Sequence, residues 1–549
     1  MRRLLVPILL LAAACSSDAS RGAQGGTLII ASAADAGAMI PLLRVSSTDR
    51  LVSELLFDPI VALGPSLNPF GDGGFEPRLA HRWSWSRDSL EITFNLDPKA
   101  RWHDDEPVVA LDVVAGFLAT RDPANASSLR VDIADIDSVT APAMRTAVFH
   151  FSRRSAEQMY TAALVYPLPA HLVDALAGGG LKTSEFAQHP IGSGPFRLVA
   201  REPTVRVEFA AVGDHYRGRP GLDRVALSIS TTPAAAIAKV WAEEADIFDV
   251  LPPPDVAESA RYPQVRLVTS AAYDYVFVAF NFRHPANREQ PHPLLGERAM
   301  RRAITMGIDR VGIVRAMFDT LAHPVYGPFV RAQFTADTTI RQIPADRAAA
   351  AALLDSLGWS AKGTDGIRRK AGQRLTLHAL VPAPSANRVR AAVLIQEQLR
   401  LLGVAMVIER LDGQAFLAAQ AAGRFDLTFG AWQTTPSPRG LRGTWGSTAR
   451  PGWGVQNHGR YASETFDSAV QSGLEARDPA VTRREIRVAY QTIVDDAAAI
   501  WLYEPVLVAG VHRRFILPPW RPDGWWRTIS EWYVETSQRL PRDARQPAP

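Results

Sequence analysis

The sequence carries few of the residue patterns that form active sites. It has no Gly-x-Ser-x-Gly, His-Glu-x-x-His or Gly-x-x-x-x-Gly-Lys segment, which mark many hydrolases, zinc proteases and phosphate-binding loops. Ser193 lies in the tight glycine- and proline-rich segment PIGSGPFRL (Pro190–Leu198), which favours a structural turn over a nucleophile. The run His103–Glu106 (HDDE) could suggest a metal site, but the 12 histidines lack paired ligand spacing. We therefore expect no catalysis, no metal and no cofactor.

The stretch from Leu427 to Ser463 is unusual in its charge, because it contains four arginines and no Asp or Glu. The stretch holds Arg439, Arg442, Arg450 and Arg460, together with Trp432, Trp445, Trp453 and Tyr461. Arginine offers forked donors for carboxylates, and aromatic rings offer flat apolar contact with a polar tip. Two interpretations stay open. The stretch is either a cationic wall that accepts a carboxylate-bearing ligand, or a solvated basic loop anchored to the core by its aromatic residues.

Alternating helix and strand patterns between Asp346 and Gln433 predict the frame that positions this stretch. The predicted helices are Arg347–Leu357 (capped by Asp346), Arg388–Leu402 and Gln414–Ala422, which end at Gly358, Gly403 and Gly423. The predicted strands are Leu375–Leu380, Val404–Leu411 and Asp426–Ala431. Strands joined by helical crossovers form a parallel sheet, and ligands bind beyond the carboxyl ends of its strands. The loop that starts at Trp432 is therefore a predicted binding position.

Three segments outside this region also have clear periodicity. Thr27–Ala31 is a short apolar run, and Glu91–Leu96 alternates apolar and polar residues, so both are predicted strands. Arg298–Phe318 has apolar residues at helical spacing, which predicts one amphipathic helix.

The N-terminus has the pattern of an export signal. Two arginines precede an apolar run from Leu4 to Ala14, which is too short to cross a bilayer. The run ends at Cys15, the only cysteine of the chain, in a context that looks like a bacterial lipobox. We expect a signal peptide over residues 1–14, a lipid on Cys15 and a flexible tether over residues 15–26. The alternative is an ordinary signal peptide with an incidental cysteine.

Composition narrows the class of protein. Hydrophobic residues make up 47% and charged residues 21% of the chain, which is typical of a globular protein with large cores. The net charge of +4 is spread over the sequence without a dense basic run, so no nucleic-acid partner is expected. A length of 549 residues predicts several domain-sized pieces.

Several segments, in order, resemble the substrate-binding proteins of the oligopeptide/dipeptide/nickel class of ABC transporters, solute-binding protein family 5. The segments are Gly25–Leu28, Glu76–Trp83 (EPRLAHRW), Ile92–Val113 (ITFNLDPKARWHDDEPVVALDV), Pro190–Leu198, Asn281–Phe282 with Arg301–Arg310, and Ala391–Trp432. Each match alone is weak, but the ordered set covers nearly the whole chain after the tether. In this family the His103–Glu106 run falls in a surface turn.

The resemblance implies an α/β, two-lobed class II periplasmic binding-protein fold with an additional family-specific domain. Lobe one would comprise residues 27–61, 189–279 and 501–549, with an inserted domain over residues 62–188. Lobe two would comprise residues 280–500. The chain would cross between the lobes near Tyr275–Asn281 and Ile500–Val508, and these crossings would form a hinge.

The resemblance also implies where ligand contacts lie. In peptide-binding relatives an Asp follows the tryptophan by three positions and pairs with the ligand's terminal ammonium. Here Trp432 is followed by Thr435, whose hydroxyl cannot neutralise an ammonium, so ordinary free-amine peptides are in doubt. Asp249, after a predicted strand at Asp246–Phe248, is a candidate substitute. The full set of candidate ligand-binding residues is Trp432, Thr435, Asp249, Tyr273, Asn281, Arg442, Trp445, Asn457 and Tyr503.

The function implied is an extracytoplasmic solute receptor of an ABC importer. We expect a monomer that captures a peptide-like, carboxylate-bearing or amine-blocked ligand and docks onto a permease and ATPase complex. Its lipid anchor would hold it at a membrane of the cell envelope, on the periplasmic or extracytoplasmic face. A nickel complex, a sugar or another solute is an alternative ligand. A hydrolase, or a ligand-sensing receptor that signals through a partner, is an alternative function for the same interlobe position.

Overall fold

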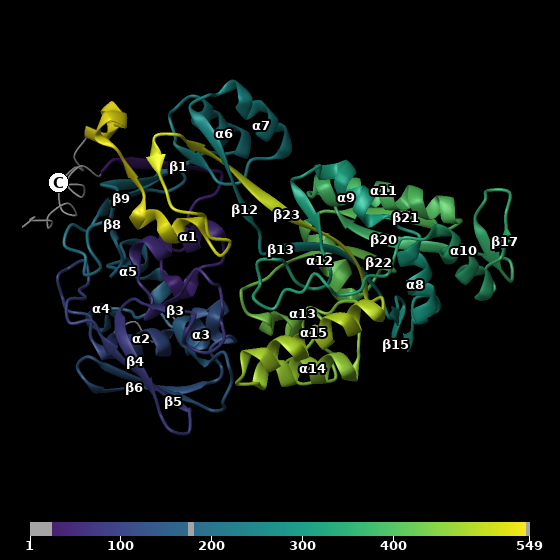
Figure 1. Cartoon of the computed structure of the whole chain (residues 1–549), viewed down its shortest axis with the longest axis horizontal. Helices are drawn as coiled ribbons and strands as arrows, with labels where there is room; N and C mark the ends of the chain where they lie inside the picture. Colours follow the sequence, from purple (N-terminus) through teal and green to yellow (C-terminus); the bar gives the residue numbers. More distant parts are fainter. Residues whose placement is uncertain (1–24, 174–179, 545–549) are drawn as a thin grey trace, which may run out of the picture.

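The computed structural model describes residues 25–173 and 180–544. The predicted signal peptide, Cys15 and all but the last two residues of the predicted tether lie outside the described residues. Over the two described ranges, no helix is both long and apolar enough to cross a membrane. The described chain forms two α/β lobes joined by long strands (Figure 1), which confirms the predicted fold class.

A twelve-stranded sheet runs through both lobes, in the order β21-β20-β22-β13-β23-β11-β1-β10-β9-β8, with β12 and β16 also paired to β23. Lobe one contributes β1 (Thr27–Ser32), β8 (Phe196–Glu202), β9 (Arg206–Ala211), β10 (Arg224–Ile229), β11 (Ile247–Phe248) and β12 (Val265–Ala271). Lobe two contributes β13 (Asp274–Phe280), β16 (Ala322–Pro324), β20 (Thr376–Pro382), β21 (Ala405–Leu411) and β22 (Leu427–Gln433).

The long strand β23 (Ala499–His512) belongs to both lobes, because its two halves pair with different strands. Its residues Val506–His512 pair antiparallel with β12, whereas Ala499–Tyr503 pair with β13. The first connection between the lobes is β23 itself. The second is the chain from β12 into β13, which runs beside β23 (Figure 1). These connections overlap the predicted crossings. The residue boundaries of the lobes stay a prediction.

A separate four-stranded antiparallel sheet lies in lobe one, within the predicted insert. Its order is β4 (Ala80–Trp85), β5 (Glu91–Leu96), β7 (Thr146–Phe151) and β6 (Ile136–Ala143), and α2 (Ala110–Arg121) packs on β6 and β7. Ile92, Phe94 and Leu96 alternate along β5 and are all buried. The predicted strand over Glu91–Leu96 is therefore confirmed, as is the first strand, β1.

Helix α1 (Ser47–Leu56) faces the C-terminal part of the chain in lobe one. It begins at a capping box, in which Ser46 Oγ accepts the Asp49 N–H (3.0 Å) and the Asp49 carboxylate accepts the Ser46 N–H (3.1 Å). α1 packs against the 3-10 helix η9 (Trp525–Glu531). The other helices of lobe one are α3 (Gln158–Ala163), α4 (Ala170–Val173), α5 (Glu185–Gln188), α6 (Pro233–Trp241) and α7 (Pro253–Glu258).

Lobe two contains the predicted alternation of strands and helices. β20 pairs in parallel with both β21 and β22, and the crossovers are α11 (Ala386–Leu402) and α12 (Gly413–Ala422). Gly403 and Gly423 end these helices with φ of +86° and +69°, a conformation that glycine adopts without strain. Asp346 Oδ1 accepts the Ala349 N–H at 2.9 Å and caps α10 (Arg347–Ser356), as predicted.

The prediction of one helix over Arg298–Phe318 is wrong. The segment forms two helices, α8 (Arg298–Met306) and α9 (Arg310–Phe318), separated at Gly307–Asp309. Asp309 caps the second helix by accepting the Gly312 N–H at 2.9 Å. The apolar periodicity continued through the break, but the local capping bond began a new helix.

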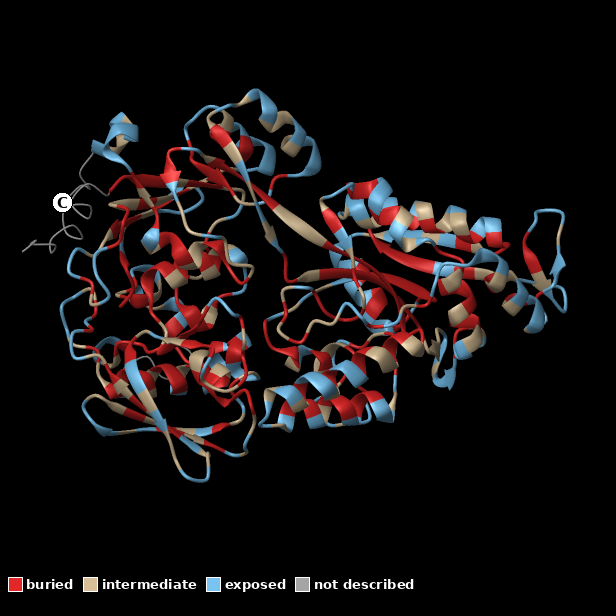
Figure 2. Cartoon of the chain, viewed as in Figure 1, coloured by how far each residue is buried: buried red, intermediate tan, exposed pale blue. Residues whose placement is uncertain are grey.

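Three helices follow β22 and complete lobe two. They are α13 (Leu441–Thr444), α14 (Glu464–Glu475) and α15 (Pro479–Asp495), and α14 packs along α15. Figure 1 shows them at the lower edge of lobe two, beside the insert of lobe one. The buried residues concentrate in the strands and on the inner helix faces of both lobes (Figure 2).

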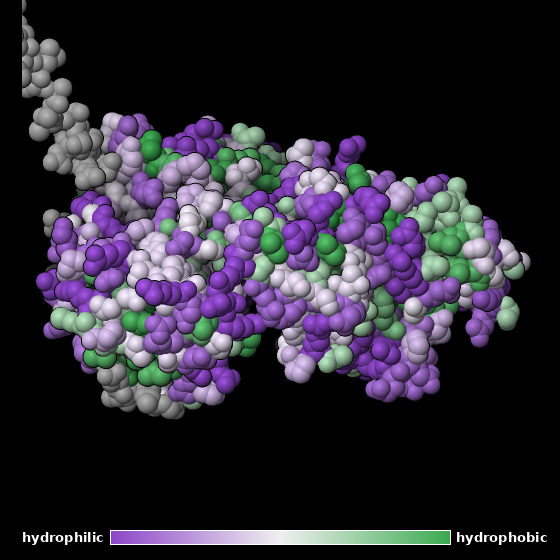
Figure 3. Space-filling model, turned by 60° about the horizontal axis from the view of Figure 1, so that its bottom comes forward, coloured by the Kyte–Doolittle hydropathy of each residue, from purple (hydrophilic) through white to green (hydrophobic). Residues whose placement is uncertain are grey.

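The surface has no single dominant apolar region on the face drawn in Figure 3. That face is mostly hydrophilic, and its hydrophobic residues lie in small separate groups. Scattered exposed apolar side chains of this kind are normal on a globular protein.

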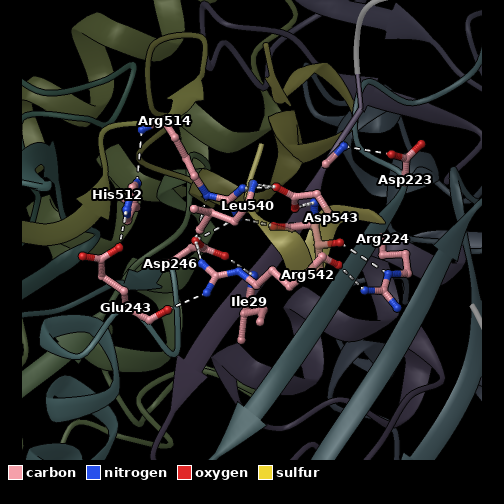
Figure 4. A network of polar contacts seen from close by, with 12 residues as sticks. Ile29, Asp223, Arg224, Glu243, Asp246, His512, Arg514, Leu540, Arg542 and Asp543 are labelled. Atoms are coloured by element: carbon pink, nitrogen blue, oxygen red, sulfur yellow. Dashed lines mark hydrogen bonds and ion pairs between the residues drawn. The ribbon is translucent and has the colours of Figure 1, made fainter. Parts of the chain in front are cut away.

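A buried network of charges closes the C-terminal segment onto the sheet of lobe one (Figure 4). Arg514 lies at its centre and donates to Asp246 (3.0 Å), to Asp543 (2.5 Å) and to the Thr27 carbonyl (2.7 Å). Asp246 also accepts the Ile29 N–H of β1 (2.8 Å). The side chains of Arg514, Asp246 and Asp543 are at most 1% exposed. The network thus ties the C-terminal segment to the start of the described chain.

Candidate functional site

The two lobes touch at a group of polar side chains that we call the interlobe contact: Asp132, Glu157 and Thr161 of lobe one with Ser437 and Arg439 of lobe two. Glu157 is buried and accepts hydrogen bonds from Ser437 Oγ and from Arg439 Nε (3.1 Å). Arg439 also donates to the Asp132 carbonyl (2.8 Å) and to Thr161 Oγ1 (2.8 Å). Burial alone would lower the pKa of Arg439, but the Glu157 and Asp132 carboxylates raise it on balance.

Further contacts join the same two surfaces. The Ala156 N–H donates to the Ala476 carbonyl at 3.0 Å, and Arg153 lies 3.6 Å from Glu475. The rings of Phe70 and Phe334 meet edge to face with centroids 5.6 Å apart. The described structure therefore has its lobes in contact along this edge.

Of the two interpretations of Leu427–Ser463, the contacts favour an anchored loop over a cationic wall, because most of its arginines are neutralised or packed. Arg439 pairs with Glu157 of the other lobe. Arg450 pairs with Glu464 (2.8 Å) and Asp467 (3.4 Å), both just beyond the stretch. The Arg442 guanidinium lies over the Trp453 ring, 5.5 Å from its centroid. The stretch is a packed loop that contributes one ion pair to the interlobe contact.

Thr435 lies beside this contact and next to two tyrosines. Its carbonyl accepts a hydrogen bond from Gln333 Nε2 (2.8 Å), and its side chain is exposed and donates to the Ser437 carbonyl (3.1 Å). Burial raises the pKa of Tyr160, and Arg439 and the Thr435 side chain oppose that rise, so Tyr160 lies next to both. Tyr273 is buried. Its carbonyl accepts the Thr434 N–H (2.6 Å), and its hydroxyl donates to the Ala332 carbonyl (3.2 Å). Thr435 and Tyr273, both predicted, are thus brought together near the lobe boundary.

Trp432 and Trp445 belong to an aromatic cluster beneath that position. Trp432 stacks on Phe277 with centroids 6.3 Å apart, and Trp445 meets Phe277 and Trp501 edge to face. Trp445 is 3% exposed and donates its Nε1–H to Tyr275 Oη (2.8 Å). The cavity that both tryptophans line measures ≈ 20 Å³, which fits about one water molecule. This cluster forms core, and only the half-buried Trp432 remains accessible.

Two predicted asparagines have their amide groups fully engaged inside lobe two. Asn281 is 0% exposed and donates to the Gly423 (3.0 Å) and Phe425 (2.8 Å) carbonyls. Asn457 is buried and donates to the Gly446 and Tyr461 carbonyls, while its own carbonyl accepts the Tyr461 N–H. Both therefore hold loops in place, and neither offers a free donor to a ligand.

Tyr503 and Asp249 lie apart from Thr435. Tyr503 is buried against Phe318 on the other face of the lobe-two sheet, and burial raises its pKa to about 12. Asp249 lies in lobe one and accepts the Trp525 Nε1–H at 3.3 Å. Burial raises the pKa of Asp249, and the Trp525 bond opposes that rise. Asp249 is therefore near η9, on the opposite side of the interlobe region from Thr435.

Sequence reasoning missed an arginine cluster in lobe one, which consists of Arg44, Arg50, Arg521 and Arg527 around Glu54 and Asp523. Glu54 pairs with Arg527 (2.7 Å) and Arg44 (3.3 Å), and Asp523 pairs with Arg521 (2.9 Å). Burial raises the pKa of Tyr273, Asp523 raises it further, and Arg521 and Arg527 oppose that rise. The cluster therefore lies close to Tyr273, near the lobe boundary. Its members come from both ends of the chain, and Glu54 and Arg527 are 473 positions apart, so no local pattern could reveal it.

The Gly/Pro turn at Ser193 is structural, as expected. Ser193 is 1% exposed and its Oγ accepts the Asp58 N–H (3.3 Å). His103 accepts the Gly192 N–H on Nδ1 (3.2 Å), and burial lowers its pKa to about 4.

A cavity of ≈ 270 Å³ lies next to this turn in lobe one, lined by Lys99, Arg101, Trp102, His103, Asp105, Arg197, Ala211, Val212, Gly213, Asp214, His215 and Tyr216. It contains none of the predicted ligand-binding residues. Across residues 25–173 and 180–544, no group of three His, Cys, Asp or Glu could hold a metal ion.

Comparison with known proteins finds a family whose model matches most of the chain. The model of bacterial extracellular solute-binding proteins, family 5, matches residues 74–452. The chain is 26% identical to di/tripeptide-binding protein 2 of Pseudomonas aeruginosa over 498 residues, covering 86% of this chain and 88% of that protein. It is 25% identical to the oligopeptide-binding protein AppA of Bacillus subtilis over 345 residues, 62% of this chain and 61% of AppA.

Solved structures share the fold. The substrate-binding protein CtaP of Listeria monocytogenes superimposes with a TM-score of 0.80 at 20% identity, covering 93% of this chain and 100% of that one. AppA of Bacillus subtilis, solved with a nonapeptide, superimposes with a TM-score of 0.74 at 21% identity, covering 93% and 99%.

Proposed function

Because the chain belongs to family 5 of the bacterial extracellular solute-binding proteins, we propose that it captures a peptide-like ligand between its two lobes for an ABC importer. Di/tripeptide-binding protein 2 and AppA, named for peptide binding, support the substrate class. A permease and ATPase complex in the membrane would receive the ligand. Closure of the lobes would remove the ligand's polar groups from water and replace their hydration with fixed donors and acceptors.

The position of Thr435 carries the proposal for the ligand's character. It is exposed at the edge of the interlobe contact, beside Tyr160 and Tyr273, where a ligand held between the lobes would reach it. Its hydroxyl already donates to the Ser437 carbonyl, and no carboxylate takes its place at this position. A terminal ammonium buried here would find no carboxylate at position 435, and a buried charge left unpaired costs several kcal/mol. The preferred ligand therefore carries a blocked amine or a carboxylate.

Thr435→Asp should reverse this preference. We expect wild type to bind N-acetylated peptides at least about tenfold more tightly than the same peptides with a free amine, because each 1.4 kcal/mol is tenfold. Thr435→Asp should improve free-amine binding, whereas the neutral control Thr435→Asn should not. Isothermal titration with matched di- and tripeptides measures both, and mass spectrometry of ligand that co-purifies checks the class independently.

Asp249 offers the competing route to an ammonium. If wild type prefers the free amine and Asp249→Asn loses that preference, the interpretation of Thr435 is wrong and Asp249 supplies the charge. Turnover of a peptide by the purified protein would instead support the hydrolase alternative. Genes for a permease and an ATPase beside this one would favour import over a signalling receptor.

Lipid attachment at Cys15 is the second part of the proposal. It rests on the apolar run before the single cysteine and on the small residues that precede it. Cys15→Ser should release the protein from membranes without changing its fold, because residue 15 precedes the first strand by twelve positions. Intact mass and membrane fractionation provide the measurement. A mature chain that starts elsewhere, with no lipid mass, would contradict the anchor.

A further inference from the structure

The arginine cluster of lobe one carries more positive than negative charge. Its four arginines face two carboxylates, those of Glu54 and Asp523. Asp249 lies at the edge of the cluster, where it accepts a hydrogen bond from Trp525 of η9. Burial raises the pKa of the Asp249 carboxyl, which favours its neutral form. The cluster is assembled by α1 and η9, which pack together, and its charges act on Tyr160 and Tyr273 near the lobe boundary.

Three of the four arginines have fixed partners. Arg527 donates to Glu54 and lies 3.5 Å from Asp523. Arg44 donates to Glu54 (3.3 Å). Arg521 donates to Asp523 (2.9 Å) and to the Leu63 carbonyl (2.7 Å). These three guanidinium groups are therefore committed to holding α1, the chain after β2 (Val61–Leu63) and η9 together.

Arg50 differs from the other three. Over the described part of the chain, its guanidinium makes no hydrogen bond or ion pair, although it is half-buried. It lies one helical turn before Glu54 on α1, yet Glu54 is already engaged by Arg44, Arg527 and the Trp526 Nε1–H (2.8 Å). Burial lowers the pKa of Arg50, Arg44 lowers it further, and Glu54 only partly offsets them. Tyr160, which adjoins Thr435 of lobe two, is also among its neighbours.

We propose that Arg50 binds a carboxylate of the ligand from the lobe-one side, and so selects for anionic ligands. The proposal rests on the proposed function, since it places the ligand between the lobes. A half-buried cation without a partner is costly in the empty protein, and a carboxylate would supply two oxygens to its forked donors. The paired arginines around it hold the cluster's shape and repel a second cation. Carboxylate recognition thus comes from α1 and not from the Leu427–Ser463 stretch.

The test uses three probes and three variants of the full mature chain. The probes are N-acetyl-Ala-Ala-Ala with a free carboxylate, its C-terminal amide, and succinate. The variants are Arg50→Gln, Arg50→Lys and the control Arg197→Gln, which changes an exposed lobe-one arginine on β8. We expect wild type and Arg197→Gln to bind the free carboxylate at least about tenfold more tightly than the amide. Arg50→Gln should abolish that difference, and Arg50→Lys should restore part of it.

Thermal unfolding of the empty protein gives a readout without ligand. Because Arg50→Gln removes an unpartnered charge, the empty variant should be at least as stable as wild type, and its stabilisation by the free-carboxylate peptide should disappear. An empty variant that is clearly less stable would show that Arg50 is structural and would overturn the proposal, as would an unchanged carboxylate preference in Arg50→Gln. Arg50-dependent binding of succinate without binding of either peptide would uphold the role of Arg50 and refute the peptide class. Equal binding of both peptides by wild type would uphold the peptide class and refute the role of Arg50. Binding of no probe would overturn both the peptide class and the role of Arg50.

Discussion

Arg514→Met should lower the free energy of unfolding by about 3–5 kcal/mol, the largest stability effect we expect in this protein. The substitution keeps most of the side-chain volume but removes the central cation of the network in Figure 4. Asp246 and Asp543 would stay almost fully buried with less positive charge between them. The Thr27 carbonyl at the start of β1 would also lose its donor. Urea unfolding followed by tryptophan fluorescence measures the change.

Arg513→Met is the matched control, because it changes the neighbouring arginine. Arg513 is exposed, and among the described residues its guanidinium donates only to the Pro263 carbonyl at the surface (2.7 Å). Its loss should change the unfolding free energy by less than about 1 kcal/mol. Equal effects of the two substitutions would mean that the buried network does not stabilise lobe one more than a surface contact does.

Glu157→Ala should weaken ligand binding at least about tenfold, although Glu157 need not touch the ligand. In the described arrangement Arg439 is held by Glu157 at the interlobe contact. Without this carboxylate, the mostly buried Arg439 would keep neutral acceptors and only the Asp132 carboxylate nearby, a cost of up to about 3–5 kcal/mol that separated lobes avoid by hydrating the arginine. The variant should therefore favour separated lobes. Solution scattering should show a larger radius of gyration for the ligand-free variant than for wild type.

Arg153→Ala tests whether the effect is specific to the buried pair. The Arg153–Glu475 pair joins the same surfaces at 3.6 Å, but both side chains are more than one-third exposed (36% and 48%). Such surface pairs contribute at most about 1 kcal/mol, so affinity should change little. A Glu157→Ala variant with unchanged affinity and unchanged radius would rule out a role of this contact in holding the lobes together.

Local sequence patterns were sufficient to predict several helices and strands of this protein. Repeating patterns located β5, α11 and α12 nearly to the residue, because alternation, helical periodicity and glycine stops act over a few positions. The same reasoning predicted the parallel pairing of β20 with β21 and β22. It failed at Arg298–Phe318, where an aspartate cap started a second helix inside a continuous apolar pattern.

Which charged side chains lack a partner could not be predicted before the chain was folded. The arginines at 439 and 450 looked like a cationic wall because the sequence near them lacked acids, yet Glu157 lies 282 residues from Arg439. Arg50 lies one helical turn before Glu54, but the folded chain brings Arg527 to that carboxylate. Charges interact through space over a few ångströms, so their partners depend on the fold and not on sequence separation. The sequence could therefore predict the family and the frame, whereas the free cation beside the lobe boundary emerged only from the packing of α1 against η9.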